Sequence, residues 1–295
     1  MNDEIICPAC KAGSRIIGKK YPGKGVEKLL DIESVAECPA CGLAFAWPIP
    51  DQDKLDNYYS EGAYWNHQAN PGRATHLHSL SQAIARANVC KKWLEVMPDD
   101  ILDVGAGFGW QADGMIQVFG HHPASNYWFI EPDDNAANQI LNRVAGLQPS
   151  RISSIESKSN INLIFANQVL EHVADPVKFL NIIASSMAVG GHIYIEVPNR
   201  DDLSKDDVFP HTLFYSPESL REQLESTGLD IIVLEEFGKM LSRDTMTLFY
   251  RLGFRVATYL HLNKIAIAFD KLIWKYQAVQ NGIWLRVLAK KIRTT

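Results

Sequence analysis

The chain has 295 residues, of which 46% are hydrophobic, and a formal net charge of −5. This apolar content is sufficient for a full hydrophobic core and excludes a disordered chain. No run of eighteen apolar residues occurs, and the N-terminus lacks the basic and then apolar order of a secretory signal. We therefore expect a cytoplasmic protein with one large domain and a smaller module.

The charge is distributed unevenly along the chain. Residues 239–295 carry eleven lysines and arginines against two acidic residues, a net of +9, so the first 238 residues sum to −14. An acidic body argues against nucleic acid as a partner. The basic C-terminal part could instead contact an anion or, peripherally, the inner face of a membrane.

Four of the five cysteines form two pairs near the N-terminus, in a segment that glycines divide. Cys7 and Cys10 enclose two residues, and after 27 further residues Cys38 and Cys41 repeat the spacing. Two thiolates three positions apart can hold a metal ion from one tight turn, and four complete a tetrahedral sulfur shell. The pattern predicts a structural zinc site in a ribbon over residues 1–50. A doubled motif in a cytosolic chain argues against a disulfide framework or a redox pair.

Residues 51–98 link this ribbon to the rest of the chain. They begin with an aromatic cluster, made of Tyr58, Tyr59, Tyr64 and Trp65. The cluster is either a seam between ribbon and core or a lid over a ligand. Apolar residues at helical spacing follow over 74–97, and they include Cys90, which we expect in the core.

From residue 100 onward, short apolar runs alternate with helical patterns, which is typical of βαβ units around a mostly parallel sheet. The predicted strands are Ile101–Val104, Tyr127–Glu131, Ile161–Ala166, His192–Val197, Leu229–Leu234 and Met246–Tyr250. Helices are predicted between them, and two of these begin at Pro176 and at Ser216-Pro217, because proline is favoured in a first helical turn.

A glycine-rich loop follows the first predicted strand, in the segment ILDVGAGFGW over 101–110. A phosphate-binding P-loop would continue with lysine, and a dinucleotide fingerprint would need glycine or alanine where Trp110 stands. What remains is an acid followed by three glycines at alternate positions, Asp103, Gly105, Gly107 and Gly109. An acid at a strand end suits an ammonium group better than a pyrophosphate, and S-adenosylmethionine brings an amino acid together with a nucleoside.

The chain resembles the class I S-adenosylmethionine-dependent methyltransferases, whose first motif has the form of this loop. Glu131, at the end of the second predicted strand, stands where the family has an acid that accepts both ribose hydroxyls. The segments 161–176, 190–199 and 209–231 resemble the family's later motifs. The resemblance covers roughly residues 55–250 and implies an α/β fold with a doubly wound, mostly parallel, Rossmann-like sheet of seven strands.

The resemblance also implies the residues that bind the cofactor. In the family the glycine loop packs against the methionine part of the cofactor, and the acid at Asp103 contacts it directly or through water. Asn167 stands where many members have an acid, so its contact runs through an amide. The adenine is expected near residues 153–156, and Tyr64 is the expected cofactor contact from the aromatic cluster.

Methyl transfer from a sulfonium needs alignment and exclusion of water, and an oxygen or carbon acceptor also needs a base. His172, beyond the strand Ile161–Ala166, and His211, in the connection over 198–215, are both expected at the carboxyl edge of the sheet. Either is a candidate catalytic base. Alternatively, Glu171 and His172 pair with the backbone or with each other to fix their loop, and His211 only packs or positions substrate.

The C-terminal residues 251–295 are predicted to form a basic helical extension. An apolar stripe runs from Ile265 to Ile283, and Lys264, Lys271 and Lys275 lie on another face. Such a helix either caps the domain or lies in a membrane surface.

The predicted order is therefore a ribbon over 1–50, a lid and linking helix over 51–98, a methyltransferase domain over 99–250, and the extension over 251–295. The resemblance implies methyl transfer to a hydroxyl or carbon of a small molecule or a sugar or polysaccharide precursor. Two alternatives are the same chemistry on a membrane lipid or quinone precursor, and a non-catalytic scaffold that binds the cofactor. The sequence indicates no oligomeric state.

Overall fold

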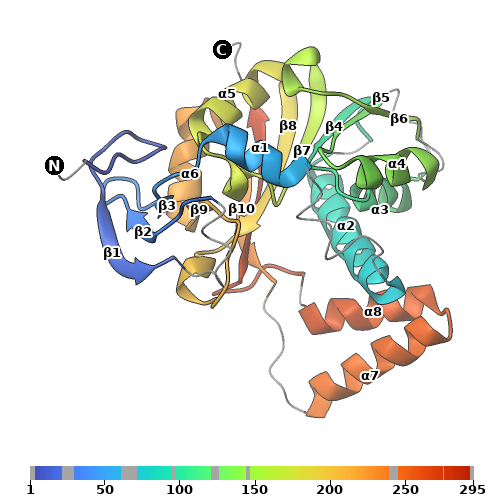
Figure 1. The fold of residues 1–295 in the computed structure, drawn as a ribbon. Coiled ribbons are helices and arrows are strands. Elements are labelled where there is room, and N and C mark those ends of the chain that lie inside the picture. Colours follow the sequence, from blue (N-terminus) through green and yellow to red (C-terminus); the bar gives the residue numbers. More distant parts are fainter. Residues whose placement is uncertain are drawn as a thin grey trace.

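The computed structural model describes residues 4–21, 30–60, 72–94, 97–120, 126–143, 147–238, 245–274 and 276–292. Within these ranges the chain forms a sheet of seven strands and a sheet of four strands, with helices around the larger one (Figure 1). The short helices outside the two main layers are α1 (Gln52–Ser60), η3 (Ile155–Ser157), η4 (Leu170–His172) and η5 (Asp201–Leu203).

The larger sheet has the strand order β10-β11-β8-β7-β4-β5-β6. Its strands are β4 (Asp100–Val104), β5 (Asn126–Ile130), β6 (Pro149–Arg151), β7 (Ile161–Asn167), β8 (Met187–Pro198), β10 (Leu229–Phe237) and β11 (Trp284–Lys291). β4 pairs in parallel with β5 and with β7, and β11 runs antiparallel to both of its neighbours. The chain leaves β4 on one side and returns to the other side at β7, which creates a topological switch point. The predicted fold class is confirmed.

Helices cover both faces of this sheet, as a parallel sheet requires. One face packs against α2 (Arg73–Trp93), α3 (Trp110–Phe119) and α4 (Asp134–Arg143), and the other against α5 (Pro176–Ser186) and α6 (Pro217–Ser226). Alternate residues of β7 enter the two cores, with Leu163 and Phe165 on the α2 side and Ile164 and Ala166 on the α5 side. Cys90 is fully buried in the core on the α2 side, as predicted.

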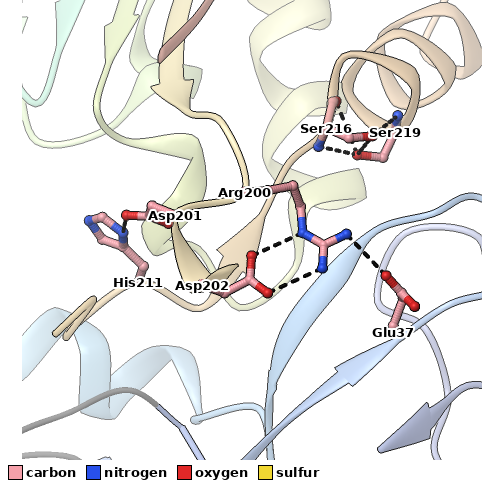
Figure 2. A network of polar contacts seen from close by, with 7 residues as sticks. All are labelled: Glu37, Arg200, Asp201, Asp202, His211, Ser216 and Ser219. Atoms are coloured by element: carbon pink, nitrogen blue, oxygen red, sulfur yellow. Dashed lines mark hydrogen bonds and ion pairs between the residues drawn. The ribbon is translucent and has the colours of Figure 1, made fainter. Parts of the chain in front are cut away.

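Both predicted helix starts are confirmed. Asp175 accepts a hydrogen bond from the backbone N–H of Lys178 at 2.9 Å, and proline follows it in the first turn of α5. The start of α6 is a capping box between Ser216 and Ser219 (Figure 2), again followed by proline. These caps satisfy amide groups that a helix leaves unpaired at its N-terminus.

The smaller sheet joins the N-terminal segment to the larger domain. Its strands, in spatial order, are β1 (Arg15–Lys20), β2 (Ser34–Glu37), β3 (Ala44–Trp47) and β9 (Leu213–Phe214). The first three belong to the N-terminal segment, but β9 belongs to the connection that follows β8. β3 and β9 are antiparallel, with Ala44 opposite Phe214 and Phe45 opposite Leu213.

The C-terminal part differs from the prediction in two places. Met246–Tyr250, predicted as a strand, lies in helix α7 (Thr245–Tyr259), because apolar residues continue at helical spacing through Leu252 and Val256. The extension over 251–295 is not helical throughout. Among its described residues α8 (Asn263–Trp274) ends the helical part, and the sheet strand β11 follows.

Charged residues in β11 explain why a strand was not predicted there. Arg286 is buried and donates to Glu235 Oε2 at 2.7 Å and to the carbonyl of Tyr276 at 2.8 Å. The ammonium group of Lys291 is also buried and donates to the carbonyls of Ala184 and Met187. Because these partners are remote in sequence, the charges make the segment look like a solvated tail.

Among the described residues, no helix is both long and apolar enough to cross a bilayer.

Candidate functional site

A cavity of about 860 Å³ lies at the carboxyl ends of β4, β5 and β7. Open α/β sheets bind ligands at this edge, beside the switch point. Among the predicted site residues, those that line the cavity are Asp103, Gly105, Gly107, Glu131, Asn167 and His172. The segment 153–156, predicted near the adenine, lines it as well. Gly109 and His211 do not line it, and Tyr64 lies outside the described residues.

The three glycines of the loop adopt the left-handed backbone conformation, with φ of 67° at Gly105, 55° at Gly107 and 76° at Gly109. A β carbon on Gly105 would lie 2.6 Å from Cγ2 of Val169, so the loop packs directly on the segment after β7. A β carbon on Gly109 would lie 3.0 Å from Ile140 of α4. Gly109 therefore serves the packing of two helices, whereas Gly105 and Gly107 border the cavity.

Glu131 connects this loop to the end of β5. Its Oε2 accepts a hydrogen bond from the N–H of Gly107 at 2.8 Å, and its Oε1 accepts one from the N–H of Asp133 at 3.0 Å. The side chain is buried and lines the cavity. The two bonds hold the carboxylate in a fixed position beside the glycine loop.

Asp103 is a buried acid near the end of β4. Its Oδ2 accepts a hydrogen bond from the hydroxyl of Tyr127 at 2.9 Å. Burial raises the pKa of Asp103 to about 7, whereas the Tyr127 hydroxyl and the Arg86 guanidinium favour the carboxylate. The group is thus close to half ionised at neutral pH, and a cation beside it would favour the ionised form.

Two amide side chains that line the cavity have buried atoms without a hydrogen-bond partner among the described residues. They are Oδ1 of Asn167, at the end of β7, and both Oε1 and Nε2 of Gln111, in the first turn of α3. Buried polar atoms almost always have a partner, so these atoms indicate a polar ligand. Gln111 was not predicted, and its signal in the sequence is only its place directly after the glycine loop.

Arg86 of α2 is a second cavity residue that the sequence did not reveal. It makes a bidentate ion pair with Glu196 of β8, with Nε–Oε2 at 2.9 Å and Nη2–Oε1 at 2.5 Å. Burial lowers the pKa of Arg86, but the charge of Glu196 outweighs this effect and holds the pKa above its ordinary value. The pair therefore stays ionised and fixes α2 against the sheet.

His172 lies at the end of η4 and lines the cavity. Its Nδ1 is 2.7 Å from the hydroxyl of Tyr59, which lines the cavity from α1. Burial lowers the pKa of His172 well below its ordinary value, and the charge of His211 adds to the effect. The imidazole is therefore neutral at physiological pH and able to accept a proton.

Of the two predicted alternatives for this loop, a direct hydrogen bond between His172 and Glu171 is not formed, with 3.8 Å between Nε2 and Oε1. His172 instead hydrogen-bonds the backbone at Pro210, which partly opposes the lowering of its pKa. Glu171 is fully buried, and burial raises its pKa well above the ordinary value, with further increases from Asp201 and Glu196. Burial thus favours the neutral form of this acid.

His211 lies behind His172, and the two ring centroids are 4.8 Å apart in a T-shaped arrangement. Nδ1 of His211 is 3.0 Å from Oδ2 of Asp201 (Figure 2), and Lys205 lies 2.9 Å from the same oxygen. Burial raises the pKa of Asp201, but His211 and Lys205 outweigh this and lower it. Asp201 is thus a carboxylate that holds His211 beside His172.

The described part of the aromatic cluster has two different surroundings. Tyr58 packs edge-on against Phe209 of the connection, with 5.4 Å between ring centroids, which is the predicted seam. Tyr59, its neighbour, borders the cavity instead.

The four paired cysteines come together as predicted. Sγ of Cys7 is 3.7 Å from that of Cys41, Sγ of Cys10 is 3.4 Å from that of Cys38, and all four atoms lie within 4.8 Å of one another. Tetrahedral zinc with Zn–S bonds of about 2.3 Å requires sulfur atoms about 3.8 Å apart. The sulfur arrangement fits a zinc ion.

The two cysteine turns have the same backbone form. The N–H of Lys11 donates to the carbonyl of Cys7, and the N–H of Gly42 donates to that of Cys38. Gly42 takes the left-handed conformation, with φ of 73°, and Lys11 takes the equivalent position with φ of 61°.

Polar contacts connect this ribbon to the segment that carries His211. Arg200 donates to Glu37 of β2 at 3.0 Å and to Asp202 at 2.9 and 3.1 Å (Figure 2). The hydroxyl of Tyr21 donates to the carbonyl of His211 at 2.9 Å. The ribbon therefore contacts the backbone next to the candidate site.

Solved structures of other proteins have a fold similar to that of this chain. The plantazolicin methyltransferase BamL, in complex with an analogue and S-adenosylhomocysteine, superposes with a TM-score of 0.52 at 14% identity, over 81% of this chain and 95% of that one. The [4+2]-cyclase SpnF gives 0.50 at 16% identity, over 82% and 96%. A methyltransferase from Aquifex aeolicus gives 0.47 at 14% identity, over 78% and 97%. At these identities the likeness concerns the fold.

Family membership comes from the sequence model of a methyltransferase domain, which matches residues 73–234. This range is more than half of the chain, and it includes the glycine loop, Glu131, Asn167 and His172. No curated protein matches with significance. The chain belongs to the methyltransferase-domain family and has the class I S-adenosylmethionine-dependent methyltransferase fold.

Proposed function

We propose that the protein transfers a methyl group from S-adenosylmethionine to a hydroxyl or carbon of a small-molecule or sugar-type acceptor. The observation that carries this proposal is one cavity, which contains both hydrogen-bond acceptors suited to the cofactor and a neutral histidine. Its volume of about 860 Å³ is near the upper end of the range of roughly 300–1,000 Å³ for ligand pockets, as a site for two substrates requires.

The hydrogen-bond donors of the cofactor match hydrogen-bond acceptors that the protein places along the cavity. The ribose hydroxyls would donate to the fixed carboxylate of Glu131, and the ammonium group to Asp103 and to Oδ1 of Asn167. Bare backbone at Gly105 and Gly107 leaves room for the methionine part. The adenine would lie against residues 153–156.

The acceptor would lie beside Tyr59 and His172, on the side of the cavity remote from Glu131. A neutral imidazole can take the proton that an oxygen or carbon acceptor must lose. His211 does not reach the cavity, so we assign it a positioning role behind His172. The methyl transfer itself then depends on alignment and on exclusion of water.

A membrane lipid or lipid-linked precursor is a second class of acceptor. It is favoured by the exposed apolar residues of α7 and α8.

The first prediction concerns the glycine loop. Gly105→Val should abolish detectable S-adenosylhomocysteine binding in calorimetry, because its β carbon would displace Val169 and with it the segment that leads to His172. Gly120→Val is the matched control. Gly120 also has positive φ, at 87°, but no atom of the described residues lies within 4 Å of its β carbon position, so this variant should lose stability and retain binding. Normal binding by Gly105→Val would contradict the placement of the cofactor.

The second prediction follows from the pKa of Asp103. Since the carboxylate is needed for the ammonium group and its pKa is about 7, the affinity for S-adenosylmethionine should rise roughly eightfold from pH 6 to pH 7.5. Asp103→Asn should bind more weakly and lose this dependence, because its amide does not titrate. Calorimetry at the two pH values measures both, and a wild-type affinity that falls with pH would contradict the assignment.

The third prediction separates the two histidines. His172→Asn should lower kcat roughly a hundredfold or more and leave cofactor affinity unchanged, as expected for loss of a general base. In His211→Asn the pKa of His172 should rise, because a positive charge that lowers it is removed. The acidic limb of kcat/KM, which reports loss of the neutral base, should then move to higher pH. If the acidic limb of kcat/KM does not move in His211→Asn, the positioning role of His211 is contradicted.

We also infer that the four cysteines hold a structural zinc ion. Three of them are buried, and they belong to the same core as Leu220 and Leu224 of α6, so the ribbon and the domain would be stabilised together. Four sulfur ligands leave no open position for a substrate.

The fourth prediction tests this zinc ion. Metal analysis of the purified chain should give one zinc per molecule, and Cys38→Ser should lose it and unfold at a temperature about 10 °C lower. Cys90→Ala is the control, because Cys90 is buried in the core on the α2 side and away from the cluster. Retention of zinc by Cys38→Ser, or its loss in Cys90→Ala, would contradict the proposed ligands.

A further inference from the structure

The helices α7 and α8 are inserted between two strands that need no long connection. β10 and β11 are antiparallel neighbours, and Phe237 at the end of one is opposite Trp284 at the start of the other. Two residues can join such strands, but here residues 238–283 stand between them. In Figure 1, α7 and α8 lie beyond the end of α2, away from both sheets. The sheet itself therefore does not require these helices.

The inner face of the two helices is firmly packed. Ala257 of α7 and Ala266 of α8 are buried against Leu77 of α2. Asp270 of α8, itself buried, pairs with His78 of α2 at 2.9 Å and accepts a hydrogen bond from the hydroxyl of Tyr276 at 2.7 Å. The pair of helices is thus a fixed part of the fold and presents one definite surface outward.

That outward surface is apolar to an unusual extent for a protein exterior. Scattered exposed apolar residues are normal, whereas contiguous ones mark an interaction site. We call the following exposed residues of α7, α8 and the turn between them the outer face: Leu248, Phe249, Leu252, Val256, Tyr259, Leu260, Leu262 and Ile265. In α7 the members 248, 252, 256 and 259 recur at helical spacing and form a stripe.

The charges beside the outer face have one sign. The described residues of α7, α8 and their turn include Arg251, Arg255, Lys264 and Lys271, and the acidic residue among them, Asp270, is buried. The first 238 residues carry a net charge of −14. An anionic surface would therefore attract the outer face and repel most of the rest of the molecule.

We propose that the outer face binds the surface of an anionic lipid bilayer, with α7 and α8 lying in the interface. A packed helical pair with an apolar stripe and flanking cations has the properties of an interfacial membrane anchor. A second copy of the chain is a poorer partner, because a two-fold dimer through this face would place four cations opposite the same four cations.

The proposed contact would also place the cavity close to the lipid. Leu77 and His78 of α2 contact the inner face of the helical pair. Ser79 and Gln82, which are one and four residues further along α2 than His78, line the cavity. A lipid-linked acceptor could then reach His172 from the bilayer. This consequence rests on the proposed function, but the membrane contact does not.

Co-sedimentation of the full chain with vesicles is the fifth test. Wild type should sediment with vesicles of equal parts phosphatidylcholine and phosphatidylglycerol at low salt, and not with phosphatidylcholine alone. Leu252→Glu should weaken binding at least about tenfold. Val189→Glu is the matched control, because Val189 of β8 is 57% exposed and Leu252 is 60% exposed. Arg255→Gln combined with Lys264→Gln should weaken binding roughly 25-fold.

Three results would overturn the proposal. They are failure of wild type to sediment with the anionic vesicles, equal loss of binding in Leu252→Glu and Val189→Glu, and a dimer in light scattering that Leu252→Glu converts to a monomer. All variants should still bind S-adenosylhomocysteine, since none lies at the cavity. A chain that binds vesicles but not this cofactor would retain the membrane contact and lose the proposed function.

Discussion

The pairing of β3 with β9 is the interaction on which the acceptor side of the site depends. β9 directly follows His211 and Thr212, and the carbonyl of Thr212 accepts a hydrogen bond from the N–H of Ala46 in the ribbon. Without this pairing, β3 would expose an edge strand and the carbonyl of Thr212 would lose its partner in the ribbon. A metal ion in the ribbon would thus act on the site through backbone hydrogen bonds, at a distance from any reacting atom.

Buried polar atoms without hydrogen-bond partners destabilise the fold in the same region. Glu171, Asn167 and Gln111 have buried polar atoms that no described residue satisfies, and each such atom costs of the order of 1–3 kcal/mol. For Asn167 and Gln111, which line the cavity, a bound ligand would recover part of this energy. Glu171 is not a cavity residue, and burial raises its pKa, which favours the neutral acid over a buried, unpaired charge. Binding energy of the ligand and stability of the fold are therefore linked at this site.

Local patterns in the sequence were sufficient for β4, β5, β7, β8 and β10, because these strands contain apolar runs, and for the starts of α5 and α6, which have recognisable caps. They were not sufficient for β6, which has only three residues, or for β11. The buried Arg286 and Lys291 of β11 bind partners that are remote in sequence. The cofactor side of the cavity could likewise be predicted, since Asp103 and Glu131 stand at strand ends. Arg86 could not, because only the tertiary packing of α2 brings it to the cavity, and for Tyr59 the sequence left a seam and a lid open as alternatives.

This difference has a physical origin in how the cavity is assembled. The proposed cofactor side comes from one stretch of chain, residues 103–167, in which loop and strand spacing determine the geometry. The proposed acceptor side combines three separate segments. Tyr59 belongs to α1, His172 follows β7, and His211 lies in the connection whose strand β9 pairs with the ribbon. Substitutions in α1, the ribbon or the connection can reshape the acceptor side while the glycine loop stays unchanged. A sequence motif can therefore identify the cofactor of such a domain, whereas its acceptor depends on contacts between segments that no motif contains.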